Sequence, residues 1–273
     1  MKNFDIVIQG PVYDETFNLI REYKDLSFVN KIIVSTWKEW ENICKKIDYP
    51  NVEIIINNDI DFSGDENRNK QIFSSLNGIR ACNSEYVIKI RSDMLWTKSS
   101  IYDMKDFFFK YKNCKLKRLD HKNKPLGRIF CAGIYDNFPF HPFDCMFWGH
   151  KEDLIDLFNI PLCTELPTHN YQSQTRAETY IASHYYAKFD QDVADMLKRP
   201  DLYLFDNSKY YQFAIKKSRS FGSKILKPFP KSIMNMIWYK QSFVNYYDWD
   251  LRTLQDGLWF HEHDMSDEEK QYE

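Results

Sequence analysis

Four short apolar runs divide the first ninety residues, and each is followed by glycine, proline or polar residues. The runs are FDIVIQ (4–9), KIIVST (31–36), VEIIIN (52–57) and YVIKI (86–90). Apolar residues at helical spacing lie between them, in segments 14–26, 38–46 and 67–83. Strand–helix alternation that repeats three times with short links predicts a parallel sheet with right-handed crossovers.

The pattern is less regular after residue 93. Segments 99–112, 151–158 and 175–189 have helical spacing, whereas RIFCAGIY (128–135) and DCMFWGH (144–150) have the apolar character of strands. We therefore predict an α/β, Rossmann-like domain over residues 1–200, with a mostly parallel sheet flanked by helices.

Residues 201–273 are expected to form a mainly helical extension packed on the same domain. From Asn207 to Tyr247 the chain has no acidic residue, but it has eight basic ones among many apolar side chains. Such a segment could lie on an anionic membrane surface. The alternative is a helix pair that packs on the domain and leaves its basic face in solvent.

Composition and charge argue against several classes of protein. The net charge of −2 argues against a general nucleic-acid binder. The six cysteines form no C-x-x-C pair, the N-terminus lacks a signal-peptide layout, and no apolar run is long enough to span a membrane. These features favour a cytoplasmic protein. The aromatic content of 17% fits a sugar-binding cleft, although a compositional bias towards Phe, Tyr, Lys, Asn and Ile is the simpler explanation.

The sharpest chemical signal is the stretch EYVIKIRSDML (85–95), where an interior strand ends on Arg91, Ser92 and Asp93. Open α/β sheets bind ligands outside the carboxyl ends of their strands, so Asp93 is placed to meet a metal ion or a nucleotide diphosphate. The alternative role for Asp93 is to cap the helix that follows.

Other strand ends and helix starts add candidate ligand-binding residues. A glycine after the first strand lets the backbone approach a nucleotide base, although a plain turn has the same residues. Cations in the first turn of a helix oppose its dipole, so they favour an anionic ligand over capping. The donor-binding candidates from these positions are Gln9, Gly10, Pro11, Ser35, Thr36, Asn67 and Arg68.

Two further carboxylates are candidates for acid–base work. Asp144 lies in the aromatic cluster FPFHPFDCMFW, where burial disfavours its charge unless it is paired. Glu178 begins the helix RAETYIASHYY after a polar loop, a suitable position for a general base. Each also has a structural alternative. Asp144 could be bonded to backbone N–H groups, and Glu178 could be favoured in the first turn by the helix dipole alone. In the C-terminal run HEHD (261–264), His263 could join Asp93 at a metal, although a polar surface tail has the same composition.

In their order and spacing, the motifs VIQGPV, NRNKQ, YVIKIRSD, FDCMFWGHKEDL and RAETYI resemble the WavE-type lipopolysaccharide synthesis family, over roughly residues 4–185. The resemblance implies a GT-A-like fold and glycosyl transfer to a bacterial surface polysaccharide. In GT-A enzymes a D-x-D motif at this strand end holds a divalent metal on the donor diphosphate. Here Arg91 stands in place of the first aspartate, so either Asp93 binds Mn²⁺ or Mg²⁺, or Arg91 partly replaces the charge of the metal.

The resulting hypothesis is a glycosyltransferase that uses a nucleotide sugar, and we expect the donor to be UDP-linked. Its acceptor would be a hydroxyl of a lipopolysaccharide, capsule or other surface glycan or glycolipid. Arg91, Ser92 and Asp93 would bind the donor, and Asp144 or Glu178 would orient or deprotonate the acceptor. The alternatives are a sugar nucleotidyltransferase, which should have a basic, glycine-rich loop after the first strand, and a non-catalytic carbohydrate-binding module.

Overall fold

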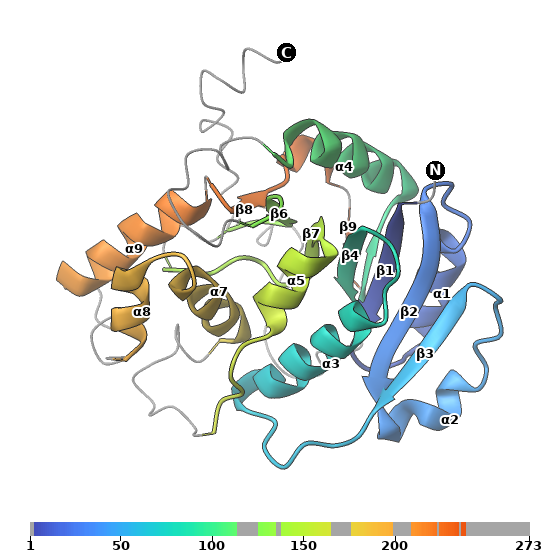
Figure 1. Ribbon diagram of the computed structural model, residues 1–273. Helices are drawn as coiled ribbons and strands as arrows, with labels where there is room; N and C mark the ends of the chain where they lie inside the picture. The colour runs from blue at the N-terminus through green and yellow to red at the C-terminus, as the bar shows by residue number, and fades with distance from the viewer. Residues whose placement is uncertain are drawn as a thin grey trace.

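The computed structural model describes residues 3–113, 125–134, 138–164, 176–198, 209–222, 224–234 and 236–238. Its main body is a seven-stranded sheet in the order β3-β2-β1-β4-β7-β6-β8 (Figure 1). The strands are β1 (Phe4–Gln9), β2 (Val29–Trp37), β3 (Val52–Asn57), β4 (Tyr86–Arg91), β6 (Ile129–Cys131), β7 (Met146–His150) and β8 (Leu226–Pro228).

Four of the six neighbouring strand pairs are parallel, which confirms the predicted α/β class and its mostly parallel sheet. β7 runs antiparallel to both β4 and β6, so the sheet changes direction beyond β4. The chain leaves β1 towards β2 and β3, and then returns to the other side of β1 as β4. The strand order therefore reverses between β1 and β4, and their carboxyl ends form a switch point at which sheets of this kind bind ligands.

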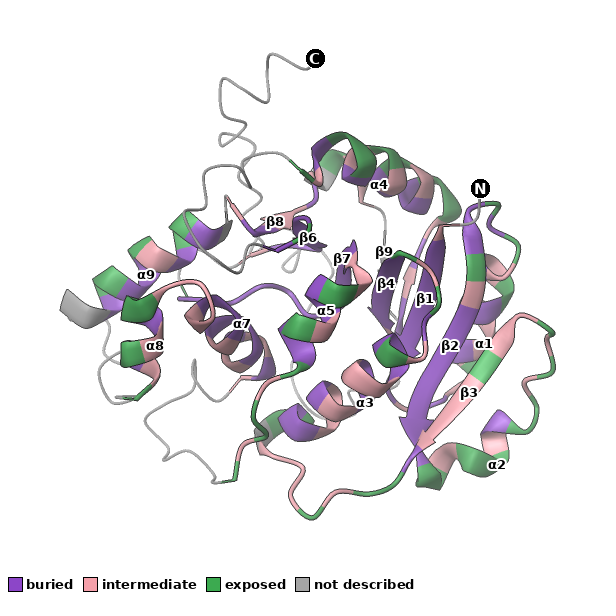
Figure 2. Cartoon of the chain, viewed as in Figure 1, coloured by how far each residue is buried: buried purple, intermediate pink, exposed green. Residues whose placement is uncertain are grey.

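Helices cover both faces of the sheet. Phe4, Ile6 and Ile8 of β1 pack with α1 (Asp14–Tyr23) and α4 (Lys98–Tyr111) on one face. Val7 points to the opposite face, into a second apolar cluster with α3 (Arg68–Arg80), α5 (Lys151–Phe158) and α7 (Ala177–Ala187). Figure 2 shows β1 buried along its length, while the outer sides of α4 and α5 are partly exposed. Both faces of β1 are therefore buried, including Asp5 and Gln9, the polar residues that share a face with Val7.

Helix α3 lies close to the strands because of a glycine. A Cβ atom added to Gly78 would lie 2.5 Å from Val7 Cγ1 and 3.0 Å from Ser35 Cβ. Any side chain there would push α3 away from β1 and β2.

The C-terminal segment contributes more than helices. After α8 (Gln191–Leu197) and α9 (Lys209–Gly222), the chain adds β8 to the sheet edge, and β9 (Met236–Trp238) pairs with β5 (Met94–Trp96). The two short strands were not predicted from the sequence. Short 3₁₀ turns, at Lys38–Trp40, Asp65–Asn67 and Lys231–Ile233, and the helix α2 (Glu41–Cys44) complete the described elements.

The basic segment packs on the domain through its apolar face. Ala214 and Phe221 of α9 lie in the same core cluster as α7, and Lys217 of α9 forms ion pairs with Asp190 and Asp192 at 2.8 and 2.6 Å. Association with an anionic membrane surface stays a prediction, as does the division at residue 200. No helix among the described residues has the length and apolarity to cross a membrane.

Candidate active site

The carboxyl ends of β1 and β4 meet at a tight backbone corner. Ser92 N donates a hydrogen bond of 3.0 Å to Gln9 O, and Gly10 has a φ of +131°. A Cβ atom on Gly10 would lie 2.6 Å from Ser92 Oγ. Glycine is therefore required at this corner both by the backbone conformation and by the approach of Ser92. Gln9 is largely buried and Pro11 is half-buried at the same edge.

Arg91 joins the two aspartates that the sequence singled out. Its Nε and Nη2 donate to the two carboxylate oxygens of Asp93 at 3.0 and 2.8 Å, a bidentate arrangement. Its Nη1 lies 3.7 Å from Asp144 Oδ1. The exposed fractions of the three side chains are 26% for Arg91, 7% for Asp93 and 4% for Asp144. The cation is therefore the member of this network that faces solvent.

Asp144 is held by two further residues, neither of which was predicted. Gln71 of α3 donates a hydrogen bond to Asp144 Oδ2, and Lys89 Nζ donates to the Asp144 carbonyl at 2.9 Å. Lys89 is fully buried in β4. Burial lowers its pKa to about 8, although the negative charge of Asp144 acts in the opposite direction. The alternative reading of Asp144, as a carboxylate bonded to backbone N–H groups, is not what the described contacts show.

Glu178 lies in the first turn of α7, as predicted, and is half-buried. Burial raises the pKa of Glu178 to about 8; the charges of Asp144 and Glu66 act in the same direction, while Arg91 opposes them. The carboxyl is therefore mostly protonated at neutral pH, and its ionised form is a stronger base than an ordinary glutamate.

A second group of side chains, again not predicted, lies beside Glu178. His141 Nδ1 is 2.8 Å from Thr179 Oγ1, and burial lowers the pKa of His141 to about 3, so the ring is neutral. Phe138 is 38% exposed, its ring centroid lies 5.7 Å from that of His141, and the Arg176 guanidinium lies 5.9 Å from the Phe138 ring. An exposed aromatic ring with a neighbouring cation is thus present near the first turn of α7.

Several predicted donor-binding residues lie inside the protein. Ser35 Oγ donates to Ser74 O at 2.7 Å and accepts from Asn57, so its hydroxyl joins β2 to α3 and β3. Thr36 is also fully buried, and its carbonyl accepts a bond of 2.7 Å from Asn57. A role for Ser35 or Thr36 in donor binding stays a prediction.

The loop before α3 has an unusual backbone. Glu66 and Asn67 have φ values of 51° and 59°, in the left-handed region that non-glycine residues rarely adopt. Such conformations concentrate at functional sites. Arg68 is only 2% exposed and lies 4.6 Å from the centre of the Tyr180 ring. It therefore packs against α7, because the first turn of α3 faces that helix, and its predicted role in offsetting donor charge stays a prediction.

Asp93 is not part of a preformed metal site in the part of the chain that the structure describes, and metal binding stays a prediction. Among the described residues, no group of three or more His, Cys, Asp or Glu side chains is arranged to hold a metal ion. Both oxygens of Asp93, the predicted metal ligand, accept from Arg91. The second predicted ligand, His263, lies outside the described residues.

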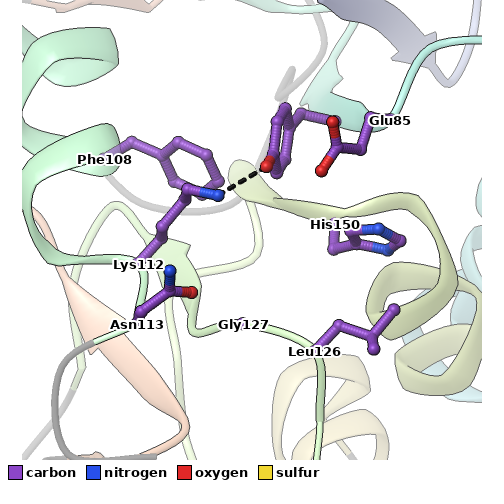
Figure 3. A pocket seen from close by; sticks show the side chains of 8 residues that line it. Glu85, Phe108, Lys112, Asn113, Leu126, Gly127 and His150 are labelled. Atoms are coloured by element: carbon purple, nitrogen blue, oxygen red, sulfur yellow. Dashed lines mark hydrogen bonds between the residues drawn. The ribbon is translucent and has the colours of Figure 1, made fainter.

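A pocket of about 280 Å³ lies at the opposite end of β4 from this network. Figure 3 shows Lys112, at the end of α4, bonded to the Tyr86 hydroxyl. Tyr86 and Arg91 are the first and last residues of β4, so they lie about 17 Å apart at roughly 3.3 Å per residue. The pocket is therefore separate from the candidate active site. It is lined by Glu85, Tyr86, Phe108, Lys112, Asn113, Leu126, Gly127 and His150.

The fold and the charged network define the class of this protein: an α/β protein with a candidate ligand site at the switch point of its sheet. The chain belongs to the WavE lipopolysaccharide synthesis family, whose model matches residues 4–217. The predicted resemblance is thus confirmed, over a longer stretch than the motifs indicated. A comparison with curated proteins gives no match.

Solved structures with a similar arrangement are distant. The 4-diphosphocytidyl-2C-methyl-D-erythritol synthase from Anaerococcus prevotii is 12% identical with a TM-score of 0.41, over 72% of this chain and 97% of that chain. Residues 1–349 of S. aureus TarS are 12% identical with a TM-score of 0.42, over 81% and 72% of the two chains. HddC from Yersinia pseudotuberculosis is 12% identical with a TM-score of 0.35, over 56% and 79%.

Proposed function

We propose that the protein is a glycosyltransferase that moves a sugar from a nucleotide-sugar donor to a hydroxyl of a lipopolysaccharide or related surface glycan. Membership of a lipopolysaccharide synthesis family supports the pathway. The main support for glycosyl transfer as the reaction is the charged network at the switch point. It combines a cation for a diphosphate, Arg91, with a glutamate of raised pKa, Glu178.

The donor would lie across the corner between β1 and β4. Gln9, Gly10 and Pro11 would line the nucleotide, because they follow β1 at the point where the strand order reverses and sheets of this kind bind ligands. The guanidinium of Arg91 would contact the diphosphate, and Asp93 would hold that guanidinium in place through its two bonds. Ser92 connects the two strands at this point and fixes the geometry of the corner.

The acceptor would approach from the side of α7. An acceptor hydroxyl oxygen forms the new bond to the anomeric carbon, and its proton passes to the ionised Glu178 carboxylate. The bond between that carbon and the diphosphate oxygen breaks, and its electron pair leaves with the nucleoside diphosphate. Arg91 stabilises the developing charge, while the exposed Phe138 ring offers a stacking surface for a sugar.

Asp144 would act through its neighbours. It contacts Arg91 and raises the pKa of Glu178, so it would position the cation and strengthen the base without accepting the proton itself. Binding of both substrates in register, together with charge stabilisation on the leaving diphosphate, would supply most of the rate.

The test is acceptor-dependent release of nucleoside diphosphate. The purified protein is incubated with UDP-, GDP- or CDP-sugars and a lipopolysaccharide-derived oligosaccharide, and product glycan is followed by mass spectrometry. We expect one nucleotide class to support transfer, with UDP-sugars the first to try. Release of pyrophosphate from a nucleoside triphosphate and a sugar phosphate would instead identify a nucleotidyltransferase. Glycan binding without binding of any nucleotide would indicate a non-catalytic module.

A further inference from the structure

The charges at the switch point have the opposite arrangement to that of a cation-binding site. Divalent metals such as Mg²⁺ are bound by carboxylate oxygens that face the ion. Here the carboxylates of Asp93 and Asp144 are nearly buried, whereas Arg91 is 26% exposed. The member of this network that a donor would meet is therefore the cation, Arg91.

Arg91 is fixed in this position by geometry. Two of its nitrogens donate to Asp93, at 3.0 and 2.8 Å, and a third lies 3.7 Å from Asp144. The two carboxylates thus hold the guanidinium from different sides. Asp93 follows the end of β4, and Asp144 lies just before the start of β7. A guanidinium stays charged at every physiological pH, so Arg91 can attract phosphate oxygens while its Nε and Nη2 donate to Asp93.

Charge balance also disfavours a metal between these groups. Asp93 and Asp144 contribute two negative charges, and Arg91 and the buried Lys89 supply two positive ones nearby. A divalent ion at Asp93 would have to displace Arg91 from both carboxylate oxygens. The released cation would then lie beside the ion, which Coulomb repulsion opposes.

We propose that Arg91 takes the place of a divalent metal, so that the guanidinium binds the donor diphosphate directly and donor binding needs no metal ion. This inference rests on the proposed function, because it assigns the diphosphate-binding group of the same site.

The first experiment measures nucleotide binding with and without metal. The wild-type protein is titrated with UDP, GDP and CDP by calorimetry, once in EDTA and once in Mn²⁺. We expect one nucleotide to bind in EDTA with a Kd within about threefold of its value in Mn²⁺. Binding that appears only in Mn²⁺ would overturn this inference while leaving glycosyl transfer intact. Absence of binding in both conditions would overturn the proposed function, and this inference with it.

The second experiment changes the group itself. In Arg91→Gln, the affinity for the same nucleotide in EDTA should fall roughly ten- to hundredfold, the range for loss of a charge-assisted hydrogen bond. Arg80→Gln, which removes an exposed arginine at the end of α3, is the matched control and should leave the Kd unchanged. Equal affinities in wild type and Arg91→Gln would overturn the inference.

The third experiment reverses the charge. Arg91→Asp would leave three carboxylates at the site, at positions 91, 93 and 144, without their cation. We expect Mn²⁺ to raise the melting temperature of Arg91→Asp and to restore its nucleotide binding, while wild type responds to neither EDTA nor Mn²⁺. A wild-type protein that is itself stabilised by Mn²⁺, with the ion competing against Arg91 for Asp93, would count against the proposal. Should Arg91→Asp not fold, Arg91→Gln decides alone.

Discussion

Glutamine in place of Glu178 should change activity and stability in ways that depend on pH. If the ionised carboxylate is the base, kcat/KM follows its ionised fraction. With a pKa of about 8, that fraction is roughly 1% at pH 6, 9% at pH 7 and 50% at pH 8. Wild-type kcat/KM should therefore rise about tenfold from pH 6 to 7, and about fivefold more to pH 8.

The stability of the folded protein gives a readout that does not depend on any substrate. The pKa of Glu178 is about 8 when folded, against an ordinary value of 4.5. The folded state therefore holds the extra proton between these pH values, and wild-type stability falls as pH rises through the window. At about 1.4 kcal/mol per pH unit, the loss is on the order of 4 kcal/mol. Glutamine cannot ionise, so the Glu178→Gln variant should avoid this loss.

The assay is urea unfolding at pH 5 and pH 8, together with transfer rates from pH 6 to 9. The variant should be more stable than wild type at pH 8 by several kcal/mol more than at pH 5, and nearly inactive throughout. Glu152→Gln is the matched control, because Glu152 is an exposed glutamate in the first turn of α5. A stability difference that is equal at both pH values would refute the pKa, and an unchanged rate profile in Glu178→Gln would refute its role as base.

Three other predictions test separate parts of the structure. In urea unfolding, Gly10→Ala should destabilise the protein by about 1–3 kcal/mol. Adding Ser92→Ala to the same chain should recover part of this loss, because it removes the contact with Ser92 Oγ but not the backbone strain at position 10. Phe138→Ala should raise the acceptor KM severalfold with little effect on donor binding, in steady-state kinetics with each substrate varied; an unchanged acceptor KM would exclude the ring from the site. Asp5→Ala should lower the free energy of unfolding by about 2–5 kcal/mol, because the buried Asp5 carboxylate accepts bonds from Asn83 N and Ser84 N at 2.6 and 2.9 Å. Nucleotide affinity should be retained, since Asp5 is far from the switch point. A loss of less than about 0.5 kcal/mol in chemical denaturation would contradict this account.

The strands in the first half of the fold could be predicted because each is a short run rich in Val, Ile and Phe that ends on glycine or polar residues. Strands β1, β3 and β4 begin where this pattern indicates, although β3 lies at the sheet edge and is only partly buried. Strands β8 and β9 have only three residues each. Runs of that length are too short for a period to be seen, and they form because a distant partner strand is available.

Some members of the candidate site, but not their contacts, could be predicted from the sequence. Strand ends and helix starts pointed to Asp93 and Glu178, because these positions follow from local structure. The bond between Arg91 and Asp93 could not be predicted, since it depends on where two flexible side chains turn after the strand. Lys89 carried a signal that was overlooked: a lysine in the middle of the apolar run YVIKI must be buried and must find a partner.

The shared network limits what the loss of activity in a single variant can establish. Arg91 contacts both aspartates, and Asp144 in turn raises the pKa of Glu178, so the donor and acceptor sides of the site are electrostatically linked. Effects of substitutions within one such network are not additive. Asp144→Asn would weaken the hold on Arg91 and also lower the pKa of Glu178, and either change alone would reduce the rate at high pH. The position of the pH profile separates these two changes: it moves to lower pH if the pKa of Glu178 falls, whereas a weaker hold on Arg91 lowers the rate without moving the profile.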